Sequence, residues 1–287
     1  MSSSDKINET NECCGGTSDI NGINLKDDSD RSDDESNCEE TAARKLRDEL
    51  LFKQPKCSHL GDCPICFLPM PLDEQKISVH FCCGKSMCIG CAHSIYWAGE
   101  GSRDIKCPFC RRPQDIKEKG DSFAENLAIL SSEIDEDMMM RVEVNGPEAL
   151  NCLGVESLER KDYKNAFKCF KMTAELGDAM GNYHLALMYR RGDGDLIDEE
   201  EGEKYIYFLE EAAIAGDPEA RYKLGMDEFS SLNECRAVKH WIISATLGHD
   251  KSIEKLKQFY KLGFVKKDDF AAALRAHYTA VNAMKSP

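Results

Sequence analysis

The sequence lacks several features that would place the chain at a membrane or on a nucleic acid. It contains no run of about 18 apolar residues, which a bilayer-spanning helix needs. Its first 30 residues are polar and acidic, without the apolar stretch of a signal peptide, so we expect a cytosolic or nuclear protein. Basic residues are few: 37 Lys and Arg against 52 Asp and Glu give a net charge of −15. This balance argues against nucleic acid and anionic lipid as partners, because both bind basic surfaces.

Cysteine, by contrast, is abundant, with 15 residues in a chain of 287. Nine lie between Cys57 and Cys110, three lie in the acidic N-terminal segment, and three lie far downstream. Disulfides are rare in the reducing compartments expected here. Clustered cysteines in such a chain therefore indicate a metal site.

Composition divides the chain into five segments. Residues 1–40 hold twelve acidic and three basic side chains and little to bury, which predicts a disordered acidic tail. Residues 41–56 contain a predicted short helix, Thr41–Gln54, with apolar residues at helical spacing. The cysteine-rich segment is followed by an acidic linker and a long helical region, so the remaining predicted segments are 57–114, 115–146 and 147–287.

The helical region repeats. An Ala-x-x-Gly element begins at residues 174, 213 and 245, with spacings of 39 and 32. Leucine recurs independently at residues 153, 185, 224 and 256, with spacings of 32, 39 and 32. Periods of this size predict a solenoid of helix pairs. The glycine can end one helix in the left-handed conformation, and Asp178 and Asp217 are placed to cap the next helix.

The segments GNYHLALMYRRGDG and EEAAIAGDPEARYKLG resemble Sel-one-like repeats, a solenoid family related to tetratricopeptide repeats. The resemblance covers roughly residues 147–262 in three to four units and includes the family's Gly-x-Gly loop at Gly192–Gly194. The helical tail Asp268–Lys285 is expected to cap the array, because an open end would expose its core. The resemblance implies an all-α adaptor that binds other proteins and has no catalysis of its own.

The other cysteines and histidines of this region are predicted to be structural. Cys152, Cys169 and Cys235 fall on predicted helices and are expected to be small buried apolar groups. Three histidines have no second ligand at metal spacing and are expected in the core or on the surface: His184, His240 and His277.

Three Cys-x-x-Cys pairs carry the metal signal: CPIC at 63–66, CIGC at 88–91 and CPFC at 107–110. A turn of this spacing directs two thiolates at one ion, and zinc takes four such ligands in a tetrahedron. Six cysteines are too many for one zinc and too few for two closed sites. The two missing ligands must come from the stretch HFCCGKSMCIGC, residues 80–91.

The order of these pairs, with 15-residue loops after Cys66 and Cys91, resembles the RING finger. That resemblance implies a small α+β domain in which two zinc ions brace the chain crosswise and supply its folding energy. The first zinc would be held by Cys63, Cys66, Cys88 and Cys91. The second would be held by Cys107, Cys110 and two ligands from residues 80–83.

One position departs from the commonest RING pattern. Lys85 stands where a histidine ligand is usual, and a protonated lysine has no lone pair to donate. An all-cysteine variant, Cys-Gly-x-x-x-Cys, matches residues 83–88 and makes Cys83 a ligand instead. The eighth ligand is then Cys82, with His80 or an open, water-filled position as the alternatives. No His-Glu-x-x-His motif is present, which argues against a zinc hydrolase.

A RING acts without covalent chemistry, because it holds a ubiquitin-conjugating enzyme and restricts the bound thioester to reactive geometries. The resemblance implies that the enzyme-contact residues are Ile65, Ile95, Pro108 and Arg111. Trp97 is an alternative to Ile95, and a merely solvated cation is the alternative interpretation of Arg111.

Two hypotheses follow. In the first, the chain is a ubiquitin ligase without a catalytic side chain of its own, whose finger recruits the conjugating enzyme and whose repeats recruit a protein substrate. In the second, it is a non-catalytic scaffold with a zinc-stabilised interaction module, since helical solenoids bind proteins generically. A nucleic-acid-binding zinc ribbon is disfavoured by the net charge. The oligomeric state stays open.

Overall fold

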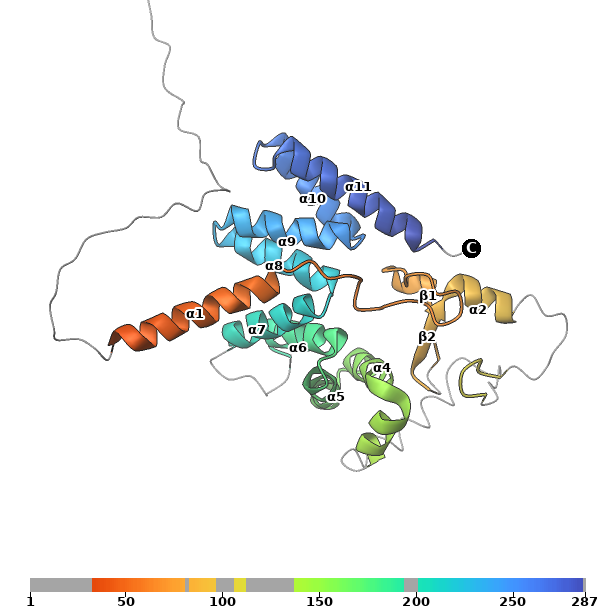
Figure 1. The fold of residues 1–287 in the computed structure, drawn as a ribbon. Coiled ribbons are helices and arrows are strands. Elements are labelled where there is room, and N and C mark those ends of the chain that lie inside the picture. The colour runs from red at the N-terminus through yellow and green to blue at the C-terminus, as the bar shows by residue number, and fades with distance from the viewer. Residues whose placement is uncertain (1–32, 81–82, 97–105, 112–136, 194–200, 286–287) are drawn as a thin grey trace, which may run out of the picture. The chain divides into compact units, whose positions relative to one another are not determined.

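The computed structural model describes residues 33–80, 83–96, 106–111, 137–193 and 201–285 (Figure 1). The chain divides into two units between Glu49 and Leu50. The described part of the first unit is the beginning of helix α1 (Asp33–Leu51). The second unit contains the cysteine-rich segment 57–111, called the finger below, and the helical repeats. Among the described residues, no helix is long and apolar enough to cross a membrane.

Helix α1 is longer than the helix predicted at Thr41–Gln54. It begins at Asp33, inside the segment 1–40 that was predicted to be disordered, and ends at Leu51. A lack of apolar residues argues against burial but not against a helix, and acidic residues suit a helix N-terminus because they face the positive end of its dipole. Leu46 and Leu50 are exposed near the end of α1, whereas Leu51 is buried.

The finger is built around a two-stranded antiparallel hairpin. A short 3-10 helix, Glu74–Lys76, leads into β1 (Ile77–His80), which pairs with β2 (Lys85–Cys88). Ile77 lies opposite Cys88, and His80 lies opposite Lys85. Helix α2 (Ile89–Tyr96) follows β2 directly. The chain therefore reverses direction after His80 and then runs through β2 into α2.

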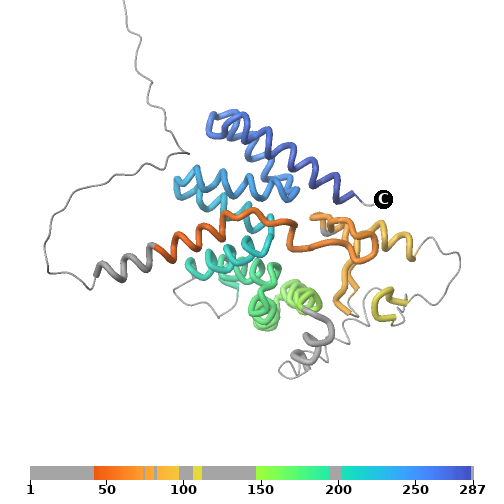
Figure 2. Tube along the Cα trace, in the orientation of Figure 1, coloured from red at the N-terminus to blue at the C-terminus, as the bar shows by residue number. Residues whose placement is uncertain are grey.

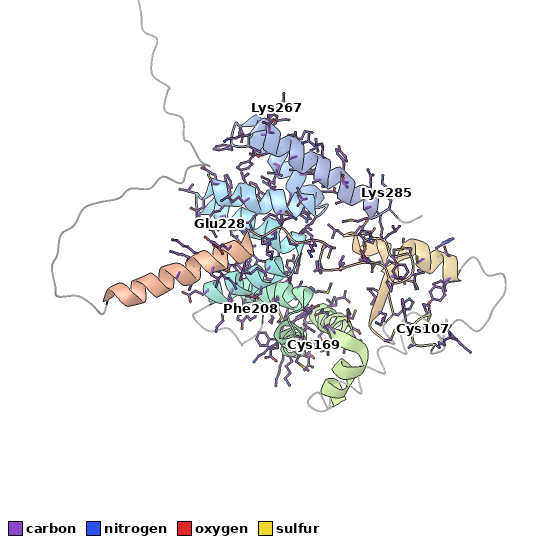
Figure 3. All side chains as sticks on the ribbon, viewed as in Figure 1. Cys107, Cys169, Phe208, Glu228, Lys267 and Lys285 are labelled. Carbon is purple, nitrogen blue, oxygen red and sulfur yellow. The ribbon has the colours of Figure 1, made fainter. Side chains whose placement is uncertain are left out.

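The repeats form a run of helices in which each consecutive pair packs together, as Figure 1 shows from α4 to α11. Side chains fill the spaces between these helices (Figure 3). The elements are α4 (Asp137–Glu159), α5 (Tyr163–Glu175), α6 (Ala179–Arg191), α7 (Glu201–Ile214), α8 (Pro218–Ser230), α9 (Glu234–Thr246), α10 (Asp250–Lys261) and α11 (Lys267–Ala283).

The Ala-x-x-Gly elements end helices α5, α7 and α9 in the same way. Their glycines, Gly177, Gly216 and Gly248, have φ values of 77°, 98° and 95°, the left-handed conformation that glycine adopts without strain. Each glycine N–H donates to the alanine carbonyl three residues earlier. The predicted caps are also confirmed, because Asp178 accepts from the N–H of Gly181 and Asp217 from those of two residues in α8.

The repeat register also sets the packing within each helix pair. Gly154 and Gly225 occupy one repeat position, and Phe170 and Trp241 occupy the position that faces it. A Cβ on Gly154 would lie 2.5 Å from the Phe170 ring, and one on Gly225 would lie 2.4 Å from the Trp241 indole nitrogen. The middle pair has Ala186 and Leu209 at these two positions, both in one core cluster. A smaller residue on one helix thus accompanies a larger one on its partner.

Three sequence predictions for this region need correction or completion. The predicted linker extends to residue 146, but α4 begins at Asp137 and continues through Pro147, since the loss of one N–H donor need not end a helix. Cys235 is exposed rather than buried. Because a helix turns about 100° per residue, Cys235 lies on the side opposite buried Ala237. The predicted final helix is present as α11, which packs on α9 and α10.

The downstream histidines lie in the core or against it. His240 and His277 are 0% and 5% exposed, and His184 stacks on Phe170 with ring centroids 4.5 Å apart. Cys169 is buried, and Cys152 is half-buried. Residues 115–136 of the predicted linker and Gly194 of the predicted Gly-x-Gly loop lie outside the described residues.

Candidate metal centres

Four cysteines of the finger form a first group whose sulfur atoms all lie within 4.8 Å of one another: Cys63, Cys66, Cys88 and Cys91. The first pair sits in a turn that follows Asp62, which bridges to Pro69. The second pair straddles the junction of β2 and α2, so that Cys88 ends the strand and Cys91 lies in the first turn of the helix. Three separate backbone elements thereby direct four thiols at one point.

A second group contains Cys83, Cys107 and Cys110, again with sulfur atoms within 4.8 Å of one another. Cys83 lies in the turn of the β1–β2 hairpin, where its N–H and that of Gly84 both donate to the carbonyl of His80. Cys82 lies outside the described residues. Among the described residues, the ring nitrogens of His80 are not part of this group.

Two of the Cys-x-x-Cys turns have the same backbone geometry. The N–H of Phe67 donates to the carbonyl of Cys63 over 2.8 Å, and the N–H of Arg111 donates to that of Cys107 over 2.9 Å. Phe67 and Arg111 have φ values of 58° and 59°, which non-glycine residues adopt rarely. The same turn thus presents one cysteine pair to each group.

The two groups alternate along the chain. Residues 63–66 belong to the first group, Cys83 to the second, residues 88–91 to the first and residues 107–110 to the second. The hairpin produces this alternation, because its turn carries Cys83 to one group while the end of β2 delivers Cys88 to the other.

The distances between sulfur atoms fit a metal ion better than a disulfide. Cys66 and Cys88 are 3.8 Å apart at their sulfurs, and Cys83 and Cys107 are 3.7 Å apart. A disulfide would require about 2.05 Å. Four sulfurs at about 2.3 Å from one zinc ion lie about 3.8 Å from each other, which is the edge of the tetrahedron. Each group could therefore hold a metal ion.

Burial and backbone N–H groups act in opposite directions on the pKa values of the cysteine thiols. Burial acts to raise the pKa of the Cys63 thiol, but backbone N–H groups, including those of Cys66 and Cys88, outweigh it and lower that pKa to about 6. The pKa of Cys91 is raised by burial and then by hydrogen bonds with the neighbouring cysteines. Burial also raises the pKa values of Cys66 and Cys83. A cation at the centre would offset the mutual repulsion of four thiolates.

The finger has little else to hold it together. Its buried core consists of Cys63, Cys88 and Cys91 with Met70, Met87 and Ala92. The partly buried residues packed against it include Cys66, Ile77, Tyr96 and Phe109. Such a small apolar core supplies little stabilisation. The chemistry of the donor set, which is all thiol in the described residues, suits zinc.

No family model matches this chain, and no solved structure matches it significantly.

The four predicted enzyme-contact residues lie on the finger surface or partly within it. Ile65 is 40% exposed in the first cysteine turn, and Ile95 is 39% exposed in the last turn of α2. Pro108 is half-buried in the last cysteine turn, and Arg111 is exposed immediately after it. Lys85 is exposed, and Trp97 lies outside the described residues.

Sequence reasoning missed one surface residue of the finger. Phe67 is 77% exposed and directly follows the CPIC turn, two residues from Ile65. A signal was available, because Phe67 holds the position after the cysteine pair that Arg111 holds in the CPFC turn. The two turns thus display a large apolar side chain in one case and a cation in the other.

Proposed function

We propose that this chain is a RING-type zinc protein that acts as a ubiquitin ligase. Its finger recruits a ubiquitin-conjugating enzyme, and its Sel-one-like repeats recruit a protein substrate. Two zinc ions stabilise the finger. The first is bound by Cys63, Cys66, Cys88 and Cys91, and the second by Cys82, Cys83, Cys107 and Cys110.

The observation that carries the proposal is the alternation of the two cysteine groups along the chain. A chain that simply bound two ions one after the other would place its first four cysteines in one group. An interleaved order is what a RING cross-brace requires. Cys82 completes the second site in the proposal because it adjoins Cys83 and has a thiol, the donor type of the other ligands.

The proposed activity is positioning rather than bond chemistry. Ile65 is exposed enough to contact an apolar surface of a conjugating enzyme. The Arg111 side chain is exposed and places a positive charge directly after the ligand Cys110. Restricting the thioester-linked ubiquitin to reactive orientations lowers the entropic part of the barrier. The finger needs no catalytic side chain for this purpose.

The test is autoubiquitination in vitro by the zinc-loaded full-length protein with a broad panel of conjugating enzymes. We expect ubiquitin chains from the wild type. With Ile65→Ala or Arg111→Asn we expect the rate of chain formation to fall at least tenfold, which corresponds to about 1.4 kcal/mol of activation free energy. Asparagine is chosen because it tolerates the positive φ of Arg111. Leu176→Ala and Arg275→Asn, exposed positions in the repeats, are matched controls.

Absence of chains with every conjugating enzyme in the panel would contradict the ligase and favour the scaffold. Equal activity of the wild type, Ile65→Ala and Arg111→Asn would also contradict the proposed contact surface. Retained zinc in each variant, measured by native mass spectrometry, separates loss of contact from loss of fold.

A further inference from the structure

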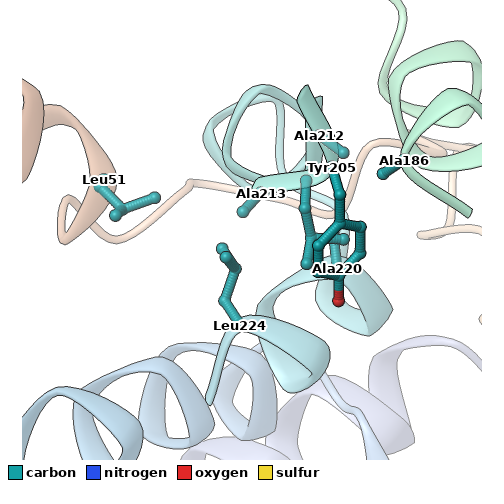
Figure 4. Close-up of a cluster of buried hydrophobic side chains, with 8 residues drawn as sticks. Leu51, Ala186, Tyr205, Ala212, Ala213, Ala220 and Leu224 are labelled. Carbon is teal, nitrogen blue, oxygen red and sulfur yellow. The ribbon is translucent and has the colours of Figure 1, made fainter. Parts of the chain in front are cut away.

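The segment Leu51–His59, called the strap below, lies across helices of the repeats. Leu51 is 1% exposed and packs in a core cluster with residues of α6, α7 and α8, including Ala213 and Leu224 (Figure 4). Further along, Gln54 accepts a hydrogen bond from Thr246 over 2.9 Å. The N–H of His59 donates to the carbonyl of Gly216 over 3.1 Å, at the turn between α7 and α8. Figure 2 traces this segment in orange after α1.

The strap covers a buried cation. Arg221 on α8 is 0% exposed and donates from Nη1 to the carbonyl of Leu51 and from Nη2 to that of Lys53. Its Nε is buried without a hydrogen-bond partner among the described residues, and no carboxylate there pairs with it. Burial lowers the pKa of Arg221 to about 10, so the guanidinium stays charged at neutral pH. A buried cation without a counter-charge is costly unless something compensates it.

A buried imidazole lies beside this cation. His240 on α9 is 0% exposed, and its ring packs on Phe52 with centroids 4.7 Å apart. Neither ring nitrogen has a hydrogen-bond partner among the described residues. Burial, followed by the charges of Arg221 and Arg236, lowers the pKa of His240 to about 3, so the ring is neutral. A neutral imidazole has one donor and one acceptor, and the strap engages neither.

The repeat register does not require an arginine and a histidine at these two positions. The spacings of 39 and 32 align Arg221 with Asn182 and Ile253. The same register aligns His240 with Cys169 on α5 and Phe208 on α7, both labelled in Figure 3. Arginine and histidine therefore occur at these positions only in the α8–α9 pair, which is the pair beneath the strap.

The strap brings no negative charge to the surface beneath it. Its sequence, LFKQPKCSH, contains Lys53 and Lys56 and no acidic residue. Phe52 lies against two cations, with Arg236 4.8 Å and Lys239 5.4 Å from its ring centroid. Glu228 pairs with Arg236, whereas Arg221 donates hydrogen bonds to the neutral carbonyls of Leu51 and Lys53. The aromatic ring suits these cations, whereas Lys53 and Lys56 are exposed and bring no negative charge to them.

We propose that this surface is a binding site for an acidic peptide with a leucine–aromatic pair, and that the strap is its intramolecular competitor. The surface, called the strap site, comprises Arg221, Arg236, Lys239, His240 and Thr246. The incoming leucine replaces Leu51, its aromatic neighbour replaces Phe52 between the cations, and its carboxylate supplies the charge that Arg221 lacks. The proposal rests on the partner-binding half of the proposed function and is independent of ligase activity.

Competition by the strap sets the apparent affinity. A site that is open for only a fraction of the time binds with its intrinsic dissociation constant divided by that fraction. Loosening the strap should therefore tighten binding of a free peptide without any new contact. A peptide carboxylate near the desolvated guanidinium adds an opposite charge, and a hydrogen bond between two ionised groups is stronger than the bonds to the neutral strap carbonyls.

The experiment measures fluorescence anisotropy of two labelled peptides on the zinc-loaded full-length protein. One has the sequence of residues 49–56, ELLFKQPK, and the other is ELLFEQPE, with both lysines replaced by glutamate. We expect ELLFEQPE to bind more tightly than ELLFKQPK. We also expect the Phe52→Ala protein to bind ELLFEQPE about tenfold more tightly than the wild type does. A tenfold gain corresponds to a strap that occupies the site about nine-tenths of the time in the wild type.

Substitution of the site supplies the second arm. In the Phe52→Ala background, Arg221→Met should lower the affinity for ELLFEQPE about tenfold, and Arg275→Met, at an exposed position in α11, should leave it unchanged. If Arg221→Met reduces folding, Lys239→Ala, at the exposed rim of the strap site, takes its place. It should also lower the affinity for ELLFEQPE, by a smaller factor. No binding of either peptide to Phe52→Ala, or equal affinity for both peptides, overturns the proposal. Peptide binding without ubiquitin transfer would contradict the ligase alone.

Discussion

At the scale of single residues, the stretch HFCCGK is the most informative part of the finger. The β1–β2 hairpin places His80 opposite Lys85 and turns the chain between them, so that Cys83 reaches Cys107 and Cys110. His80 packs instead on Phe109, with ring centroids 5.5 Å apart. These contacts favour a packing role for His80 and leave Cys82 as the proposed eighth ligand.

We predict that Cys82→Ala lowers the zinc content from two ions to one, whereas His80→Phe keeps two. Zinc prefers four ligands in structural sites, and a site with three thiolates binds far more weakly. Phenylalanine preserves the ring that packs in the finger. Native mass spectrometry of the purified protein gives the zinc count directly.

Cys57→Ala serves as the control, since Cys57 is exposed and belongs to neither cysteine group among the described residues. A zinc count of two for Cys82→Ala together with one for His80→Phe would assign the eighth ligand to His80. One zinc in the wild type would contradict both assignments.

A second residue-scale prediction concerns pH. Glu219 on α8 accepts from His249 over 2.8 Å and from Lys251 over 3.2 Å. The hydrogen bond with His249 is the largest of the effects that lower the pKa of Glu219 from its ordinary 4.5 to about 2. A lowered folded-state pKa stabilises the protein above pH 4.5, and this contribution is lost as the pH falls through 2.

Glu219→Gln should therefore lower the free energy of unfolding by on the order of 2 kcal/mol at pH 7. The difference from the wild type should shrink as the pH falls below 4.5. Urea denaturation of both proteins between pH 7 and pH 3 measures it. Glu254→Gln, at an exposed position on α10, is the control. A difference that does not change with pH would contradict the ion pair as its cause.

At the scale of the elements, the repeats combine a fixed turn with variable packing. The Ala-x-x-Gly turns and aspartate caps act within a few residues and were predictable from the sequence. The pairing of small with large residues was not predicted, because it joins positions on different helices. It becomes visible when Gly154–Phe170, Ala186–Leu209 and Gly225–Trp241 are compared in one register.

We predict that Gly225→Ala destabilises the protein by about 1–3 kcal/mol, as is usual for overpacking. At a helix position with free space, Gly→Ala would stabilise the protein by nearly 1 kcal/mol. A destabilising effect of Gly225→Ala would therefore show that the contact with Trp241 decides the outcome. Adding Trp241→Leu should recover part of the loss, because it reproduces the Ala186–Leu209 pair. Thermal unfolding of the wild type, both single variants and the double variant completes the cycle.

Gly202 provides the control, since a Cβ at this position of α7 meets nothing within 4 Å. Gly202→Ala should be neutral or stabilising. Additive effects of Gly225→Ala and Trp241→Leu would show that the two residues do not share one packing constraint.

At the scale of the whole chain, the finger and the repeats depend on different forces. The repeats have several apolar clusters, including those around Leu209, Trp241 and Phe170. The finger has one small cluster in which cysteines take a large part. Metal binding and folding are coupled where the apolar core is this small.

Removal of the metal with a strong zinc chelator should therefore unfold the finger and leave the repeats folded. Most described helical residues lie in α4–α11, so the circular dichroism signal at 222 nm should fall only slightly. Limited proteolysis should then cleave within residues 57–111 and spare residues 147–283. A cooperative loss of the whole helical signal would contradict separate stabilisation.

The sequence by itself determined the local chemistry. The three cysteine pairs, the glycine turns, the caps Asp178 and Asp217 and the final helix all follow from rules that act over a few residues. The predicted boundaries that were wrong rested on overall composition or on a single helix-breaking residue. The early start of α1 at Asp33 and the passage of α4 through Pro147 are the examples.

Only the tertiary structure decided which distant side chains meet. Leu51 and Arg221 are 170 residues apart in sequence, yet the guanidinium of Arg221 donates to the carbonyl of Leu51. No periodicity links the two residues, since the strap belongs to no repeat. The grouping of Cys83 with Cys107 and Cys110 is, by contrast, also what the resemblance to a RING predicts, and the β1–β2 hairpin turn brings it about. Such contacts form only when the chain packs. Burial of Leu51 against the repeats brings its carbonyl to Arg221, and the folding of the finger brings the thiols of each cysteine group together.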